Sequence, residues 1–352
     1  MPPLYPLLFT PTPFERIWGG DYIAKNIHSQ FPAHKKIGES WELCGLEGCN
    51  SVVCNGFLMD NEINELIEVY MGDLIGDRLY QKFGCEFPLM VKILDINDYL
   101  SFQVHPSDEI ALTRHNAYGK AEVWYILHAE PDAAIFLGFN RQMNEAELRA
   151  RCVHQTLPEV MNQYTPHPGD CFYIPPGTVH AAGGGLVVAE IQQVSDVTYR
   201  IYDWGREFLQ ESAREMHLEL AMDAINWEAF EQTHVPQQSH IPQPSPLSKP
   251  LQNNVEKLLE TPYFHLYKRL ISTPVHLSNT FGSSFRLLLC TEGEIKVTAN
   301  ESVCIKKGGV TLIPAAVTQY TIEPMTGGKE KRESEREHDE IPSAEVLEAF
   351  LP

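Results

Sequence analysis

The sequence predicts a mainly β protein, with two barrels of short strands and a few helices packed around them. Three observations lead to this prediction. Short apolar runs bounded by Gly, Pro and Asn recur before residue 231, a Gly-Pro-Gly-His pattern marks a turn between two of them, and a weakened copy of that pattern follows residue 254. The strand-like runs are SVVC, PLMVKIL, LSFQVH, EVWYIL, AAIFLGF, DCFYIP and LVVAEIQ.

Three segments have helical rather than strand-like periodicity. They are DNEINELIEVYMGDLIG from Asp60, NEAELRARC from Asn144, and REFLQESAREMHLELAMDAI from Arg206. Asn144 and Glu147 have the spacing of a capping box, which predicts a helix start at that point. We expect all three segments to be helices that cover the strands.

Two changes in composition divide the chain. Residues 231–254 contain five prolines with several Gln and Ser, which predicts a linker, and residues 327–340 are a run of charges typical of a solvated tail. We therefore predict a catalytic domain over 1–230, a linker over 231–254, a second barrel over 255–326 and a charged C-terminal tail over 327–352.

Charge and hydropathy exclude several classes of partner. Acidic residues outnumber basic ones by 47 to 27, for a formal charge of -20. Nucleic acids and anionic membranes are therefore poor partners. No run of about 18 apolar residues is present, and the first residues lack a basic segment, so we predict a cytoplasmic protein. The eight cysteines form no C-x-x-C pair, which favours inert thiols over a disulfide framework.

The chemistry is concentrated in GDCFYIPPGTVH, where a strand ends at two prolines, a Gly-containing turn follows, and His180 begins the next strand. Upstream, Gln103 and His105 are two residues apart and share a strand face. Glu122 opens a strand whose two faces are both apolar, so its carboxylate must be paired or ligated. Gln103, His105, Glu122 and His180 together predict a zinc site with an open coordination position.

Beyond the linker, the same spacing recurs through Gly308, Pro314, Ala316 and Gln319. Ala replaces the second Gly, and Gln replaces the ligand His. Residues 255–326 are therefore predicted to form a degenerate barrel that has lost its metal and has a structural role.

The complete spacing from Gly169 to His180 matches the second motif of the cupins, which are jelly-roll β-barrel proteins. The segments RIWGG, GESWELC, PLMVKILDINDYLSFQVHPSD, GKAEVWYIL, IPPGTVHA and SDVTYRIYDWGR further resemble type I mannose-6-phosphate isomerases. The resemblance implies a zinc enzyme that interconverts mannose 6-phosphate and fructose 6-phosphate. The zinc ligands would be the four residues already identified from spacing.

The resemblance also implies roles for residues around the metal. Arg200 and Lys120 belong to the active site, and the Arg200 guanidinium suits an oxyanion or phosphate. Ser101 contacts the substrate phosphate, and Trp18 and Lys92 line the pocket. The base that moves the proton is left open among Asp196, Lys120, a zinc-bound hydroxide and a pocket histidine.

Two other functions fit the same fold. One is an iron-dependent cupin oxygenase, against which Gln103 argues, because three His and one Glu are more usual there. The other is a non-catalytic bicupin that binds a sugar phosphate. The sequence does not determine the oligomeric state, the physiological direction or activity on other aldoses.

Overall fold

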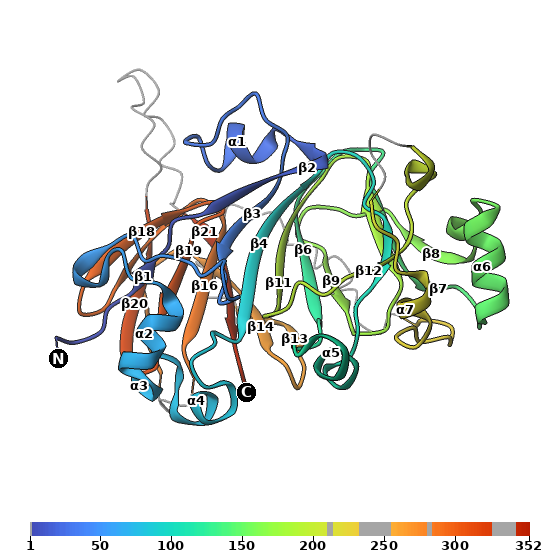
Figure 1. The fold of residues 1–352 in the computed structure, drawn as a ribbon. Coiled ribbons are helices and arrows are strands. Elements are labelled where there is room, and N and C mark those ends of the chain that lie inside the picture. The colour runs from blue at the N-terminus through green and yellow to red at the C-terminus, as the bar shows by residue number, and fades with distance from the viewer. Residues whose placement is uncertain (1, 210–213, 232–254, 280–283, 326–342) are drawn as a thin grey trace, which may run out of the picture. The chain divides into compact units, whose positions relative to one another are not determined.

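The computed structural model describes residues 2–209, 214–231, 255–279, 284–325 and 343–352. The chain forms two compact units, and each contains two antiparallel β-sheets (Figure 1). We call Pro11–Cys44 with Pro88–Gln238 the major unit, and Met1–Thr10, Gly45–Phe87 and Ser239–Pro352 the minor unit. The predicted mainly β architecture is confirmed.

The first sheet of the major unit has six strands. Their order is β2 (Thr12–Gly20), β3 (Ile37–Leu43), β4 (Leu89–Ile96), β11 (Leu186–Gln193), β6 (Glu122–Ala129) and β9 (Cys171–Ile174). At its centre, β4 and β11 pair along their full length, and every residue of both strands is buried. The nearly continuous apolar runs predicted such buried strands.

The second sheet of the major unit has the order β12 (Tyr199–Tyr202), β5 (Phe102–Val104), β10 (His180–Gly183), β7 (Ala134–Phe139) and β8 (Met161–Tyr164). One face contributes Leu137 and Ala182 to a core shared with Trp124 of the first sheet. The other face contributes Phe102 and Val104 to a second core. This sheet carries Gln103, His180 and Arg200, three of the predicted site residues.

Helical segments cover the outer face of the second sheet. The helical segments of the major unit are α1 (Tyr22–Asn26), α5 (Asp108–His115), α6 (Glu145–Val153), η2 (Leu157–Val160), η3 (Arg206–Phe208) and α7 (Leu218–Met222). Leu148 of α6 and Ala221 of α7 pack into the second core, beside β7, β8 and β12 (Figure 1). Helix α6 begins where predicted, because the Asn144 side chain accepts the Glu147 amide at 3.0 Å.

The long helix predicted from Arg206 is wrong. In the described part of residues 206–225, only the short segments η3 and α7 are helical. The His217 amide donates to the Arg200 carbonyl at 2.8 Å, and the Arg200 amide donates to His217 Nδ1 at 3.2 Å. These bonds hold the segment against β12, so tertiary pairing overrides the local helical pattern.

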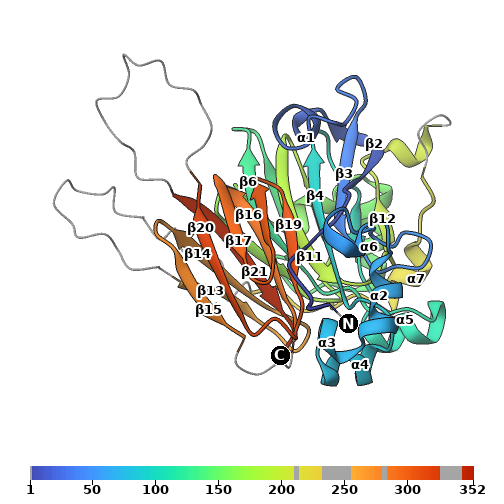
Figure 2. The same ribbon diagram turned by 90° about the vertical axis from the view of Figure 1, so that its left-hand side faces the viewer.

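The minor unit repeats part of this topology (Figure 2). Its four-stranded sheet has the order β15 (Val275–Ser278), β20 (Gln319–Pro324), β17 (Glu294–Thr298) and β18 (Ser302–Lys306), which matches β5, β10, β7 and β8 in the major unit. Its other sheet has the order β1 (Leu7–Leu8), β19 (Val310–Ile313), β16 (Arg286–Glu292), β21 (Ala344–Phe350), β14 (His265–Ile271) and β13 (Val255–Glu260). The repeated sequence pattern thus corresponds to a repeated arrangement of strands.

The helices of the minor unit come from the middle of the predicted catalytic domain. They are η1 (Gly56–Leu58), α2 (Ile63–Tyr70), α3 (Gly72–Ile75) and α4 (Asp77–Phe83). The helix predicted from Asp60 is therefore present, but it is divided at Met71, whose φ is 49°. The SVVC run forms isolated bridges, through Val52 and Val53, rather than a sheet strand.

The predicted boundaries differ from the structure in two places. Residues 1–10 and 45–87 belong to the minor unit, because β1 pairs with β19 and the amides of residues 315 and 316 bond to α3. The tail prediction is wrong for Ala344–Phe350, because β21 is a largely buried strand between β16 and β14. The predicted linker, except for Glu231, and the charge run at 327–340 lie outside the described residues.

No described helix combines the length and the apolar character needed to span a membrane. All eight cysteines are free thiols, and three of them, Cys49, Cys54 and Cys304, are exposed.

Helix α1 has an unusual cap that comes from a neighbouring strand. Its own N-cap residue, Asp21, makes no side-chain cap bond, whereas Asp95 of β4 accepts the Tyr22 amide at 2.7 Å. Burial raises the pKa of Asp95 to about 6. Folding therefore favours the protonated form, and the stabilisation linked to that proton is complete below about pH 4 and is lost as pH rises through about 6.

We predict that Asp95→Asn removes this pH dependence. Its free energy of unfolding, relative to wild type, should rise by on the order of 1 to 3 kcal/mol between about pH 4 and about pH 7, because Asn keeps a cap oxygen without ionising. Urea unfolding of both proteins across this range measures the difference, and other carboxylates cancel in the comparison. A constant difference across the range would contradict the prediction.

Candidate metal centre and active-site cavity

Three of the predicted metal ligands form a compact buried cluster in the major unit. His105 Nε2 lies 3.4 Å from one oxygen of Glu122, and His180 Nε2 lies 3.2 Å from the other. The three side chains are 0–1% exposed. They are the one group of three or more His, Cys, Asp or Glu with metal-site spacing among the described residues.

Strand register explains why these residues meet. His180 is the first residue of β10 and pairs directly with Gln103 of β5, while Arg200 of β12 pairs with Gln103 from the opposite side. Directly paired residues share a face of an antiparallel sheet, so these three side chains form a row. His105 follows the end of β5, and Glu122 begins β6 of the facing sheet.

Both imidazoles are oriented by main-chain oxygens. His105 Nδ1 lies 3.0 Å from the Val197 carbonyl oxygen, and His180 Nδ1 lies 2.9 Å from that of Thr178. A carbonyl only accepts, so the proton of each neutral ring lies on Nδ1 and the Nε2 lone pair is directed toward Glu122. This orientation is typical of metal-binding histidines.

Gln103, the fourth predicted ligand, lies beside this cluster. Its Nε2 atom is 3.2 Å from His180 Nε2. Rotation of the amide by half a turn exchanges nitrogen for oxygen at almost the same position. A neutral oxygen ligand is therefore available next to the two imidazoles and the carboxylate.

The protonation states suit a divalent cation. Burial raises the pKa of Glu122, but the charge of Lys120 outweighs this and holds the pKa well below its usual range. Burial, together with the Lys120 charge, lowers the pKa of His105 to about 4. Neither Glu122 oxygen has a hydrogen bond of ordinary geometry among the described residues, although Lys120 Nζ is 2.7 Å away. An ionised, fully buried carboxylate that lies between two imidazoles fits a metal ion.

A cavity of about 430 Å³ opens next to the cluster. It brings together the metal-ligand candidate Gln103 and all the other predicted site residues, namely Trp18, Lys92, Ser101, Lys120, Asp196 and Arg200. The rest of its lining consists of Arg16, Glu39, Leu94, Leu100, Trp124, Glu190, Thr198, Arg214 and His217. The cavity is rich in cations, in contrast to the acidic chain as a whole.

A chain of alternating charges runs along one wall. Lys92 Nζ lies 3.4 Å from Asp196 and 3.7 Å from Glu190, and Lys120 Nζ lies 3.9 Å from Glu190. Burial lowers the pKa of Lys92, but the carboxylates of Glu39, Asp196 and Glu190 outweigh this, and the net pKa is raised. Burial also raises the pKa of Glu190. The wall therefore contains groups that can hold a proton near the cavity.

Arg200 differs from the other cations because its Nε is buried and has no hydrogen-bond partner among the described residues. Burial and the neighbouring charge of Arg214 lower its pKa. Its main chain is fixed by the two bonds to His217. A guanidinium held in this way is available to an anionic ligand.

Sequence reasoning missed several lining residues. Glu190 lies within LVVAEIQ, and a lone carboxylate in an apolar strand is the same signal that identified Glu122. Arg16 is two residues before Trp18 in the same strand, and its Nε lies 2.7 Å from Glu39. Arg214 and His217 lacked a signal, because their segment had a helical pattern.

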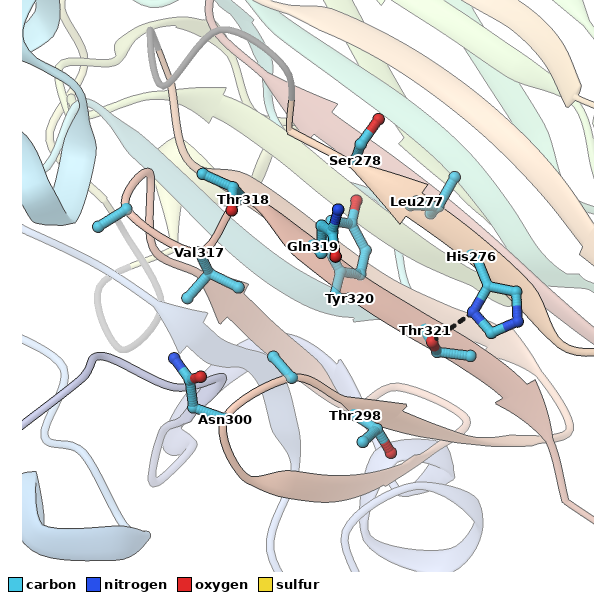
Figure 3. A pocket seen from close by; sticks show the side chains of 12 residues that line it. His276, Leu277, Ser278, Thr298, Asn300, Val317, Thr318, Gln319, Tyr320 and Thr321 are labelled. Atoms are coloured by element: carbon cyan, nitrogen blue, oxygen red, sulfur yellow. Dashed lines mark hydrogen bonds between the residues drawn. The ribbon is translucent and has the colours of Figure 1, made fainter.

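The minor unit has a separate hollow of about 720 Å³ (Figure 3). Gln319, which takes the place of the ligand His in the repeated pattern, lines it with Ser278, Thr298 and Thr321. The Gln319 side chain is exposed, whereas the next residue, Tyr320, is buried. The position that corresponds to His180 is thus on the open face of β20.

Two family descriptions match the chain. "Phosphomannose isomerase type I, catalytic domain" matches residues 7–137, and "Mannose-6-phosphate isomerase, cupin domain" matches residues 254–327.

Individual proteins match over nearly the whole chain. Mannose-6-phosphate isomerase ManA of Bacillus subtilis is 34% identical over 323 residues, which cover 90% of this chain and 96% of that protein. Mannose-6-phosphate isomerase of Streptococcus mutans is 31% identical over 315 residues, which cover 90% and 94%.

Solved structures share the fold. The mannose 6-phosphate isomerase structure from Bacillus subtilis has a TM-score of 0.76 at 24% identity, covering 98% of this chain and 99% of that chain. A variant of phosphomannose isomerase from Salmonella typhimurium has a TM-score of 0.72 at 14% identity, with the same coverage. From these matches over almost its full length, the chain belongs to the type I mannose-6-phosphate isomerase family.

Proposed function

We propose that this chain is a zinc-dependent isomerase that interconverts mannose 6-phosphate and fructose 6-phosphate. We also propose that it acts in the cytoplasm, as the sequence predicts. One observation carries the proposal: a buried His-Glu-His cluster, with Gln103 beside it, adjoins a cavity lined by cations and acid–base groups. The names of the relatives supply the substrate, a hexose 6-phosphate.

Gln103, His105, Glu122 and His180 would hold the zinc. When bound, zinc acts as a Lewis acid on the sugar oxygens near the reacting carbons. The four side chains supply two neutral nitrogens, one negative charge and one neutral oxygen, which leaves a net positive charge at the site. The carbonyls behind the imidazoles keep the ligands aligned before substrate enters.

The reaction moves a proton from C2 to C1 of the open-chain aldose, while a second proton passes between O1 and O2, through a cis-enediol. Asp196 and Lys120 both line the cavity and are the protein groups we propose for carrying these protons. Glu190, whose pKa burial raises, lies close enough to Lys120 to exchange a proton with it. With the sugar bound against this wall, the proton taken from C2 would stay on one of these side chains until it is delivered to C1.

Arg200 would stabilise the negative charge of the enediolate. Its position in the row with Gln103 and His180 puts it next to the metal ligands. Trp18, which is 4% exposed, would form an apolar wall, and the buried Ser101 hydroxyl would donate to the substrate phosphate.

We predict that removal of metal abolishes isomerisation and that zinc restores it. The four ligand side chains are themselves neutral or anionic, so a chelated protein loses the Lewis acid and keeps only Arg200 and the other cavity cations to oppose the charge of the enediolate. Bound metal is measured by elemental analysis, and the interconversion of mannose 6-phosphate and fructose 6-phosphate is followed before chelation, after it, and after zinc is added back. Full activity in metal-free protein would overturn the zinc proposal.

The same assay separates the alternatives. Glucose 6-phosphate and unphosphorylated mannose are the specificity controls. Bound iron with oxygen uptake would favour an oxygenase. Calorimetric binding of hexose phosphate to zinc-loaded protein, without any interconversion, would favour a binding protein.

A further inference from the structure

Arg214 is a cavity residue to which neither the sequence patterns nor the comparisons give a role. It follows residues 210–213, which lie outside the described residues, and lines the same cavity as Arg200 and Gln103. Its side chain is 21% exposed. A partly exposed guanidinium in a cavity requires an explanation, because it must either serve a ligand or simply hold the fold together.

The buried carboxylate of Asp203 fixes Arg214 in place. Arg214 Nε lies 3.1 Å from Asp203 Oδ2, and Arg214 Nη2 contacts Asp203 Oδ1, so the contact is bidentate. The Asp203 side chain is 0% exposed and also contacts Arg206 Nη2 at 2.8 Å. Two cations therefore share one carboxylate, and a positive charge remains. No hydrogen bond of Arg214 Nη1 is seen among the described residues.

Arg200 and Arg214 act on each other electrostatically. The charge of Arg214 lowers the pKa of Arg200, second only to burial. Arg200 Nε is buried without a hydrogen-bond partner, as described above. Arg200 and Arg214 thus place two guanidinium groups of like charge beside one cavity, and each has an N–H group without a hydrogen bond among the described residues. Such a pair can bind an oxyanion.

The positions of Arg200 and Arg214 relative to the candidate metal ligands indicate which end of an anionic substrate each of them faces. Arg200 lies in the strand row with Gln103 and His180, next to the metal ligands. Arg214 lies outside this row, on the segment that docks on β12 through His217. A hexose 6-phosphate has its reacting carbons at one end and its phosphate at the other, so it matches this order.

We propose that Arg214, held by Asp203, binds the phosphate of the substrate, with Arg200 between it and the reacting carbons. The assignment deepens the proposed function and rests on it for the identity of the sugar. The chemistry recognised is a phosphate monoester dianion, and inorganic phosphate shares that chemistry.

Arg214→Gln in the zinc-loaded full-length protein tests the proposal. We expect the KM for mannose 6-phosphate to rise by about 10- to 100-fold, the size expected for a lost charged hydrogen bond, while kcat changes by less than about threefold. The inhibition constant of inorganic phosphate should rise by about the same factor as KM. A purely structural role of Arg214 would not weaken the binding of substrate and of inorganic phosphate by the same factor.

Arg206→Gln is the matched control. Arg206 contacts the same Asp203 carboxylate but does not line the cavity. It should lower thermal stability to a similar extent, while KM and the phosphate inhibition constant stay within about twofold of wild type. Equal effects of both variants on KM would mean that Arg214 acts only through the fold, and would overturn the proposal.

Further measurements keep the test independent of isomerase activity. If wild type does not isomerise hexose phosphates, stabilisation by inorganic phosphate in thermal unfolding, weakened in Arg214→Gln, still supports the anion site while the proposed function fails. If wild type isomerises normally and Arg214→Gln does too, the phosphate assignment fails and the function stands. Should Arg214→Gln not fold, Arg214→Lys replaces it. Lysine cannot keep the bidentate contact with Asp203, so the KM and the phosphate inhibition constant should both rise in that variant, and wild-type values of both would overturn the assignment.

Discussion

Glu122→Ala is expected to lose its metal and at least about a thousandfold in turnover, because the only anionic ligand of the centre disappears. It should also unfold more easily, by about 3 to 5 kcal/mol, since Lys120 is left buried without its nearest counter-charge at 2.7 Å. Elemental analysis, turnover and urea unfolding measure the three effects. His105→Ala should likewise lose zinc.

Glu122→Gln is the control for shape. It preserves the volume of the side chain but removes the charge, so metal affinity should still fall steeply. Full zinc occupancy in both Glu122 variants would show that the ion is held elsewhere, and the proposed centre would then be wrong.

Arg200→Ala is expected to keep its zinc and to lose about 100-fold or more in turnover. The loss of one fixed donor to a developing oxyanion typically has an effect of this size. The metal should remain, because Arg200 contributes no ligand to the His-Glu-His cluster. Steady-state kinetics with metal analysis on the same samples tests both statements.

Arg200→Lys separates charge from geometry. It keeps a positive charge but lacks the planar fork, and should recover only part of the turnover. A near-normal kcat in Arg200→Ala would refute the assignment of Arg200 to the enediolate.

The residues of the candidate metal centre could be picked out from the sequence because local rules act on each of them. Alternation along a strand put Gln103 and His105 on one face, and the turn after Pro176 fixed the start of the His180 strand. Glu122 was identified because a carboxylate in an apolar strand needs a partner. The direct pairing of Gln103 with both His180 and Arg200, by contrast, depends on inter-strand register, which the sequence did not reveal.

Other features depended on contacts between distant segments. Strand β21 follows a charged run in the sequence and was therefore predicted as part of a solvated tail. Only its pairing with β14 and β16 identifies it as part of the core. Arg214 and His217 had a helical pattern, but hydrogen bonds to Arg200 hold this segment at a sheet edge. The helices of residues 45–87 belong to the minor unit because of packing that the linear order does not reveal.

The interleaving of the two units has a consequence for biosynthesis. Strand β1, Leu7–Leu8, pairs with β19, Val310–Ile313, so β1 is synthesised long before its partner strand. Sequence separation of this kind slows folding. Until β19 has been synthesised, β1 lacks this partner strand, and a polypeptide that stops before residue 310 never gains it. Premature termination should therefore yield aggregation-prone fragments rather than a smaller working enzyme.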